Sequence, residues 1–248
     1  MKIVITAPAG KMGKLLVREA LKRKNEFEIV GAVGNPNSSY IGKDISVASM
    51  TENVGVLIYK NIEEIIDKCD GVIDFSRTEV SMEVLDSCVK HKKPLMLGTT
   101  GFSDDEEKKI LEASKMIAIS ESHNTSKAVN LLYQTVAKYA KAIGKESDIE
   151  IIDYHDNKKI DMPSGTGKVF ANIVRENIKD KKVTNHSLRI GNVSSSHTIV
   201  FGMDGERIEL THHAYDFSTF AKGALDCMLY LKDKKPGMYS SLECLGLE

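Results

Sequence analysis

A histidine and a lysine four residues apart carry the clearest chemistry in this chain of 248 residues. His155 can change its charge near neutral pH, whereas Lys159 keeps a positive charge unless it is buried. The preceding residues, 149–152, read Ile-Glu-Ile-Ile and predict a buried strand that delivers both side chains into a polar loop. A proton donor beside a fixed cation suits a reaction that adds a proton to an anionic substrate.

The residues after this loop predict a helix start that binds an anion. Pro163 is followed by Ser164, Gly165 and Thr166, and the first turn of a helix offers unpaired backbone N–H groups and a partial positive charge. These three residues are therefore candidate substrate-binding residues for a carboxylate. Taken alone, the His-x-x-x-Lys spacing is equally compatible with a solvated loop that leads into an ordinary helix cap.

Composition limits the kinds of partner. A hydrophobic content of 42% is enough to bury a core, and a net charge of −1 with mixed signs gives no footprint for nucleic acid or a membrane surface. The four cysteines lie far apart without a Cys-x-x-Cys pair, and no apolar run is long enough to span a membrane. The first apolar run, 3–7, is too short for a signal peptide. We therefore expect a cytoplasmic, reduced protein.

The first 33 residues predict a strand, a turn, a helix and a second strand. Residues 3–6 are apolar or β-branched, 7–13 form a glycine-containing turn, and 27–33 are extended again. Such a turn brings backbone N–H groups close to a pyrophosphate, which is how many proteins bind a dinucleotide. Gly10 and Gly13 fit the expected spacing, with Ala7 at its first position. A tight turn without a ligand remains the alternative.

The end of the second strand lacks the carboxylate that binds the ribose of NADH in many such units. Residues 34–37 read Gly-Asn-Pro-Asn, so nothing there repels a 2′-phosphate. Lys11 and Lys43 could attract one. The sequence therefore favours NADPH at least as much as NADH.

Strands and helices continue to alternate as far as residue 124. Apolar strands at 71–75, 94–97 and 116–119 are separated by helical patterns, and capping boxes begin at Asn61 and Ser103. This alternation predicts an α/β fold with a doubly wound parallel sheet, whose ligand lies beyond the carboxyl ends of its strands. The loops at those ends are 7–13, 75–78, 98–102 and 120–124. Each is also compatible with a simple turn.

Residue 125 starts a different pattern. Residues 125–141 predict a longer helix, 197–201 and 206–212 predict an antiparallel pair around the turn 202–205, and 217–231 predict a closing helix. We therefore expect a dinucleotide-binding domain over 1–124 and an α+β domain with a mainly antiparallel sheet over 125–231. The tail, 232–248, is expected to pack back on the first domain.

With these loops in place, the chain resembles the 4-hydroxy-tetrahydrodipicolinate reductase (dihydrodipicolinate reductase) family over nearly all of its length. The motifs that carry the resemblance are Gly-Lys-Met-Gly at 10–13, Asp-Phe-Ser at 74–76, Gly-Thr-Thr-Gly-Phe at 98–102, Asn-Thr-Ser at 124–126, the block 155–166 and Phe-Ala-Lys-Gly-Ala at 220–224. The resemblance implies a Rossmann-type domain followed by a domain for substrate binding and tetramer formation.

The resemblance also implies a function. It points to NAD(P)H-dependent reduction of 4-hydroxy-2,3,4,5-tetrahydrodipicolinate to tetrahydrodipicolinate, in diaminopimelate and lysine biosynthesis, by a cytoplasmic homotetramer. His155 matches the acid of the family, Lys159 matches the lysine that assists it, and 164–166 match the carboxylate clamp. The residues that match the cofactor site are Ala7, Gly10, Lys11, Met12, Gly13, Phe75, Gly98, Thr99, Thr100, Ser122, His123 and Asn124.

Several positions depart from the family pattern. Asp156 replaces a second histidine, Ala7 replaces the first turn glycine, and Phe217 replaces an arginine. The segment before Arg189 is shorter than usual. These changes bear on substrate contacts and on the oligomer interface.

Two other functions remain as alternatives. One is a nucleotide-binding or sensing relative without turnover, and the other is a different Rossmann-type oxidoreductase. No metal site is expected, because His212 and His213 are adjacent on a strand, point to opposite faces and lack a third ligand at a suitable spacing.

Overall fold

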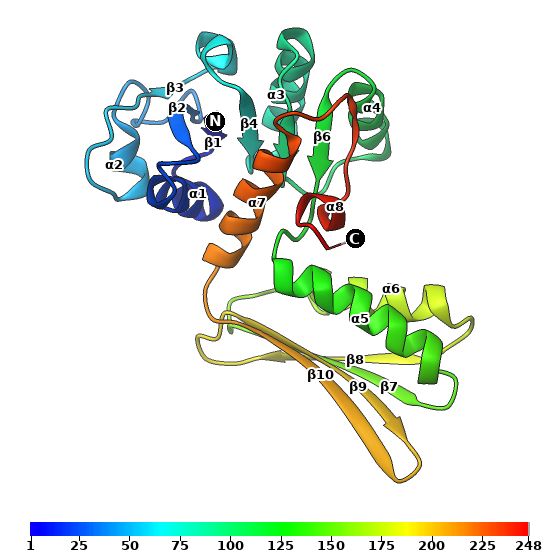
Figure 1. Cartoon of the computed structure of the whole chain (residues 1–248). Helices are drawn as coiled ribbons and strands as arrows, with labels where there is room; N and C mark the ends of the chain where they lie inside the picture. The colour runs from blue at the N-terminus through cyan, green and yellow to red at the C-terminus, as the bar shows by residue number, and fades with distance from the viewer. Residues whose placement is uncertain (248) are drawn as a thin grey trace. The chain divides into compact units, whose positions relative to one another are not determined.

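The computed structural model describes residues 1–247 and divides into two compact units (Figure 1). The first unit contains residues 1–126 together with the chain from Ser218 onward, and the second contains Lys127–Phe217. No helix within residues 1–247 combines the length and the apolar character needed to cross a membrane. Each unit has its own core, and the two are described separately.

The first unit is built on a seven-stranded sheet in which all neighbouring strands are parallel. The strand order is β11-β6-β5-β4-β1-β2-β3, so the chain winds outward from β1 in both directions. This order places a topological switch between β1 and β4, where ligands bind in such folds. The strands are β1 (Lys2–Thr6), β2 (Glu28–Val33), β3 (Ile58–Tyr59), β4 (Gly71–Asp74), β5 (Leu95–Leu97), β6 (Ala118–Glu121) and β11 (Gly237–Met238).

Helices cover both faces of this sheet. Along β1, Ile3 and Ile5 pack into one apolar cluster while Val4 packs into the other, as the two-residue period of a strand requires. The helical segments are α1 (Lys11–Lys22), α2 (Ile45–Ser49), η1 (Ile62–Glu64), η2 (Ile66–Lys68), α3 (Thr78–His91), α4 (Asp104–Ser114), α7 (Ser218–Leu231) and α8 (Ser241–Cys244). The predicted doubly wound parallel sheet is confirmed.

The second unit has a four-stranded sheet in the order β10-β9-β7-β8. It consists of β7 (Asp148–His155), β8 (Val183–Arg189), β9 (Ser195–Met203) and β10 (Glu206–Ala214). Strand β9 pairs antiparallel with β7 and β10, whereas β8 runs parallel to β7. The predicted hairpin around 202–205 and the mainly antiparallel sheet are both confirmed.

Two helices cover one face of this second sheet, α5 (Lys127–Ile143) and α6 (Gly165–Asn177) (Figure 1). Val136 of α5 and Phe170 of α6 pack with Ile149, Ile151 and Phe201 of the sheet. Residues 149 and 151 are buried on alternate positions of β7, and the same alternation carries Asp153 and His155 to the helix-covered face. The register of one strand therefore selects which polar side chains enter the core.

The position of α7 corrects the expected boundary of the second unit. Residues 218–231 were assigned to that unit from the sequence, but α7 packs with α1 and with β4, β5 and β6 of the first unit. Ala221, Ala224, Leu225 and Met228 are buried in the core of that unit. The Thr125 hydroxyl also donates to the Phe220 carbonyl over 2.6 Å. The sequence did not indicate this packing, because α7 is far along the chain from the strands that it covers.

Some short elements agree with the sequence patterns that predict them, and others have no such pattern. The capping boxes at Asn61 and Ser103 are present, although Asn61 begins a 3₁₀ turn rather than an α-helix. Strands β3, β8 and β11 were not expected. Strands β3 and β11 have two residues each, and β8 is mostly polar, so none has the apolar alternation that identifies a strand.

The turn after β1 shows how the chain accommodates Ala7. The backbone of Ala7 has a φ of 47°, its N–H donates to the Val33 carbonyl and its own carbonyl accepts from the Gly10 N–H. A Cβ on Gly13 would overlap the backbone of Ala7 and Pro8, so glycine is required there. An alanine therefore occupies a left-handed conformation that glycine adopts at lower cost.

We predict that Ala7→Gly raises the free energy of unfolding by about 0.5 kcal/mol, because relief of the left-handed strain exceeds the entropic cost of a glycine. Ala9→Gly in the same turn is the matched control and should lower it by about 0.5–1 kcal/mol. Urea unfolding of both variants tests this. Destabilisation by both substitutions to the same extent would contradict the account of Ala7.

Candidate active site

The carboxyl ends of β1, β4 and β5 meet around the buried side chain of Asp74. Its carboxylate accepts hydroxyl hydrogen bonds from Thr6 (2.6 Å), Ser76 (2.7 Å), Thr99 (2.9 Å) and Ser81 of α3. Asp74 is fully buried and sits at the end of the apolar strand Gly-Val-Ile-Asp. It therefore fixes three loops of the sheet edge to one another, a role that sequence analysis missed.

Two cavities lie at this edge of the first unit. One has a volume of about 490 Å³ and is lined by the turn 7–10, by 33–36 at the end of β2 and by 75–77. The other, about 600 Å³, is lined by Lys11 and Met12, by 75–79 and by 98–101. These volumes are in the range of cofactor sites. Phe75 and Arg77 line both cavities, and Arg77 was not among the predicted site residues.

Most of the predicted cofactor residues lie at these cavities. Gly13 packs behind the turn, and Gly98 is required because a Cβ there would overlap the Phe75 ring. No side chain caps the first turn of α1, which leaves that helix start suited to a phosphate. The predicted residues that line the two cavities are Ala7, Gly10, Lys11, Met12, Phe75, Gly98, Thr99 and Thr100.

Three predicted cofactor residues lie elsewhere in this unit. They follow β6 and line neither cavity. Ser122 is buried and accepts from the Ser241 hydroxyl over 2.6 Å, His123 is exposed, and Asn124 accepts from the Ser126 N–H. This loop is held by its neighbours in the chain and by α8.

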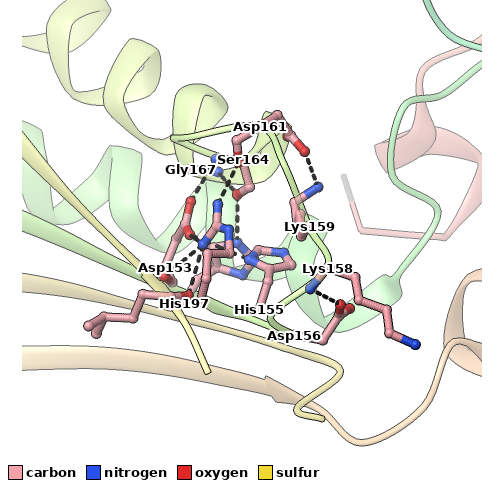
Figure 2. A network of polar contacts seen from close by, with 11 residues as sticks. Asp153, His155, Asp156, Lys158, Lys159, Asp161, Ser164, Gly167 and His197 are labelled. Carbon is pink, nitrogen blue, oxygen red and sulfur yellow. Dashed lines mark hydrogen bonds and ion pairs between the residues drawn. The ribbon is translucent and has the colours of Figure 1, made fainter. Parts of the chain in front are cut away.

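The second unit assembles its polar site through strand register. Asp153 and His155 face the helices from β7; His197 of β9 pairs with Asp153, and Arg189 of β8 pairs with His155. Residues directly opposite in a sheet share a face, so all four side chains gather at one end of the sheet. Figure 2 shows Asp153, His155 and His197 side by side there. Ser164, the N-cap of α6, joins them.

Asp153 is the centre of this network. Its side chain is 1% exposed, and its carboxylate accepts from the Ser164 N–H and from Arg189 Nη1, each over 2.6 Å. Burial opposes ionisation, but the Ser164 amide and the Arg189 guanidinium together hold the pKa of Asp153 below its usual range. Asp153 is therefore a buried carboxylate that stays charged.

His155 lies beside this carboxylate. Its Nδ1 is 3.4 Å from Asp153 Oδ1, close enough for an ion pair when the imidazole is charged but without the geometry of a hydrogen bond. Burial lowers the pKa of His155, and Lys159 and Arg189 lower it further, while Asp153 raises it. The net shift is downward, so the imidazole is mainly neutral at pH 7.

Lys159 is on the loop that follows, where its Nζ pairs with Asp161 Oδ1 over 2.7 Å. That hydrogen bond lowers the pKa of Asp161. The Asp156 carboxylate accepts from the Lys158 N–H over 2.9 Å, so its side chain folds onto its own loop (Figure 2). The acid at the position of the second family histidine therefore caps a turn.

The predicted anion clamp lies at the start of α6. Ser164 Oγ accepts from the Gly167 N–H over 3.1 Å, as the N-cap residue of a helix does. A Cβ on Gly165 would meet no protein atom within 4 Å, so the space above this helix start is open. Thr166 is half-buried beside it. Ser164, Gly165 and Thr166 thus lie together at the first turn of α6, and their role in binding an anion stays a prediction.

His197 contacts Ser164, the N-cap residue of α6. Its Nε2 is 3.2 Å from Ser164 Oγ, and its ring packs edge-on against His155 with centroids 5.3 Å apart. Burial, followed by the neighbouring His155, lowers the pKa of His197 to about 3. The neutral imidazole therefore accepts a hydrogen bond from the Ser164 hydroxyl. Sequence analysis missed His197, Arg189 and Asp153 because their partners lie far along the chain.

No group of three or more His, Cys, Asp or Glu side chains suited to a metal ion occurs within residues 1–247. His213 of β10 instead contacts Ser196 Oγ over 2.8 Å.

The low pKa of His197 predicts a loss of stability in mild acid. Below pH 6.5 the unfolded chain binds a proton at this histidine and the folded chain does not, so its contribution is complete above pH 6.5 and is lost progressively toward pH 3. We expect the wild-type free energy of unfolding to fall by about 2 kcal/mol between pH 7 and pH 5 from this residue. Urea unfolding of wild type and His197→Gln at both pH values measures it, and equal pH dependence in both proteins would contradict this assignment.

Comparisons with known proteins cover the whole chain. Residues 1–125 match the family model for the dihydrodipicolinate reductase N-terminus, and 128–245 match the model for its C-terminus. A 4-hydroxy-tetrahydrodipicolinate reductase from Buchnera aphidicola subsp. Baizongia pistaciae is 35% identical over 268 residues, covering 100% of this chain and 98% of the relative.

Two solved structures share the fold. A dihydrodipicolinate reductase from Paenisporosarcina sp. TG-14, bound to dipicolinate, has a TM-score of 0.79 at 22% identity, with 98% of each chain covered. An amine dehydrogenase from Mycobacterium smegmatis has a TM-score of 0.72 at 9% identity, covering 97% of this chain and 95% of that one. On the family models and the full-length relative, the chain belongs to the dihydrodipicolinate reductase family.

Proposed function

We propose that this protein reduces 4-hydroxy-2,3,4,5-tetrahydrodipicolinate to tetrahydrodipicolinate with NADPH or NADH, a step of diaminopimelate and lysine biosynthesis. The observation that carries the proposal is the pairing of a buried imidazole, His155, with an open helix start at Ser164–Thr166 in a member of this family. An anion seated on that helix start lies beside a group that can become a proton donor.

His155 serves as the acid in this proposal. In the free protein its pKa lies below the ordinary value, so a dianionic substrate must raise that pKa before the imidazole can donate. Substrate carboxylates at the clamp supply the negative charge. Protonation of His155 is therefore coupled to occupation of the clamp, which limits proton donation to the substrate complex.

Lys159 binds and orients the substrate. Its ammonium is held by Asp161, whose side chain is 51% exposed, so a substrate carboxylate can replace this partner without uncovering a buried charge. Gly165 is exposed at the start of α6, where a helix N-terminus favours an anion, and Thr166 follows it. The dicarboxylate is thus held by one side-chain cation and one helix terminus.

The cavities of the first unit fit a nicotinamide dinucleotide. The helix start of α1 suits the pyrophosphate, and a bound NAD(P)H supplies the hydride. A Cβ on Gly34 would lie 2.9 Å from Ile58, so the place after β2 where a carboxylate would select NADH cannot hold one without rearrangement. Arg77 lines both cavities and supplies positive charge. These features support use of NADPH at least as readily as NADH.

The proposal extends to a cytoplasmic homotetramer assembled through the second unit. Helices α5 and α6 lie on one face of its sheet (Figure 1). The opposite face carries half-buried apolar side chains. Ile152, Tyr154 and Val200 belong to that face. A partly apolar sheet face of this kind is stabilised by packing against another copy. The four buried cysteines are unpaired, as in a reducing compartment.

We predict that His155→Gln lowers kcat about 10²–10⁴-fold, because the acid is lost, and that Lys159→Ala lowers kcat/KM about 10²-fold through weaker substrate binding. Substrate-dependent oxidation of NADPH and of NADH with freshly generated substrate is the measurement. Lys138→Ala on α5 and Lys158→Ala next to Lys159, both at exposed positions of the same unit, are controls that should keep wild-type rates.

Binding of NADPH should be unchanged in all four variants, since the residues altered are in the other unit. Near-normal turnover in His155→Gln would remove that residue from the mechanism. Cofactor binding by wild-type protein without any substrate-dependent oxidation would instead support the relative without turnover.

A further inference from the structure

Arg189 contacts both the strand that carries His155 and the loop that carries Lys159. Its side chain is 7% exposed, its Nη1 donates to Asp153 Oδ1 and its Nη2 donates to the Asp161 carbonyl, both over 2.6 Å. Asp153 in turn accepts from the Ser164 N–H and lies beside His155. One guanidinium therefore reaches the strand with the acid, the helix start and the loop that carries Lys159.

We propose that Arg189 is the positioning residue of this site, holding the proton donor, the anion clamp and the lysine loop in one fixed arrangement. The proposal rests on the roles given above to His155, Lys159 and Ser164–Thr166. Arg189 acts through Asp153 and through the Asp161 backbone, and it needs no contact with the substrate.

The shape of the guanidinium explains why arginine suits this position. Its planar fork directs two nitrogens at two acceptors from different segments, a buried carboxylate of β7 and a backbone carbonyl of the loop before α6. A lysine carries the same charge on one nitrogen and cannot reproduce this geometry. Charge and geometry can therefore be separated by substitution.

The charges around His155 provide a second signature. The charged groups that act on its imidazole are Asp153 on its own strand, Lys159 on the loop and Arg189 on β8. Lys159 is itself paired with Asp161, and the neutral His197 of β9 packs against the ring. Arg189 lowers the pKa of His155 and Asp153 raises it. Removing Arg189 and removing the charge of Asp153 should thus shift this pKa in opposite directions.

This opposition distinguishes positioning at the site from a general structural role. A general loss of packing has no reason to move the His155 pKa upward in one variant and downward in the other. In Arg189→Met the Ser164 N–H still donates to Asp153, which keeps that carboxylate ionised near neutral pH.

The experiment compares wild type with Arg189→Met, Arg189→Lys, Asp153→Asn and His155→Gln. Histidine ring resonances are titrated by NMR, with the His155 signal assigned by its absence in His155→Gln, and kcat/KM is measured across pH. Dipicolinate serves as the probe of the clamp. Arg175→Met is the matched control, because Arg175 is an exposed arginine near the end of α6 in the same unit.

We expect Arg189→Met to raise the His155 pKa, to lower kcat/KM about 10²-fold and to weaken dipicolinate binding about tenfold. Arg189→Lys should lower kcat/KM about tenfold with the His155 pKa closer to that of wild type, because the charge remains and the fork is lost. Asp153→Asn should lower the His155 pKa, and Arg175→Met should match wild type.

A wild-type His155 pKa and wild-type turnover in Arg189→Met would overturn the proposal while leaving the proposed function intact, provided that His155→Gln is inactive. Normal turnover in His155→Gln would instead overturn the proposed function. If circular dichroism shows that Arg189→Met does not fold, Arg189→Lys decides, since wild-type turnover in that variant would show that the fork is unnecessary.

Discussion

One buried carboxylate determines the geometry of the second unit. Burying the charged Asp153 side chain costs free energy unless an opposite charge and hydrogen-bond donors offset it. A guanidinium from β8 and a backbone amide from the start of α6 do so here. These two partners fix the distance between strand and helix. The positions of His155 and of the proposed anion clamp follow from this arrangement, since His155 follows Asp153 on β7 and the clamp begins at Ser164.

The first unit also contains a buried carboxyl side chain, but different groups hydrogen-bond to it. Asp74 is also fully buried, but its partners are four hydroxyl groups from the ends of neighbouring strands and from α3. Those donors are neutral hydroxyl groups, whereas the Arg189 guanidinium offsets the charge of Asp153 beside the proposed clamp. In both units a buried acidic residue near the end of a strand accepts hydrogen bonds from separate segments and so holds them together.

Local patterns predicted what depends on local structure. The parallel sheet, the hairpin at 202–205 and the two capping boxes follow from periodicity and short-range hydrogen bonds. Strand β8 and the packing of α7 were not predicted. A polar strand has no apolar alternation, and the sequence of a helix does not indicate which distant surface the helix covers. Arg189 and His197 were missed for the same reason, as their partnership with Asp153 exists only through sheet register.

The central claim is that a neutral, buried His155 becomes charged when an anion occupies the clamp. Calorimetry of dipicolinate binding at pH 7, in buffers with different ionisation enthalpies, measures the protons taken up on binding. The account predicts an uptake approaching about one proton per chain in wild type and its loss in His155→Gln. Binding without proton uptake, or with equal uptake in both proteins, would contradict it.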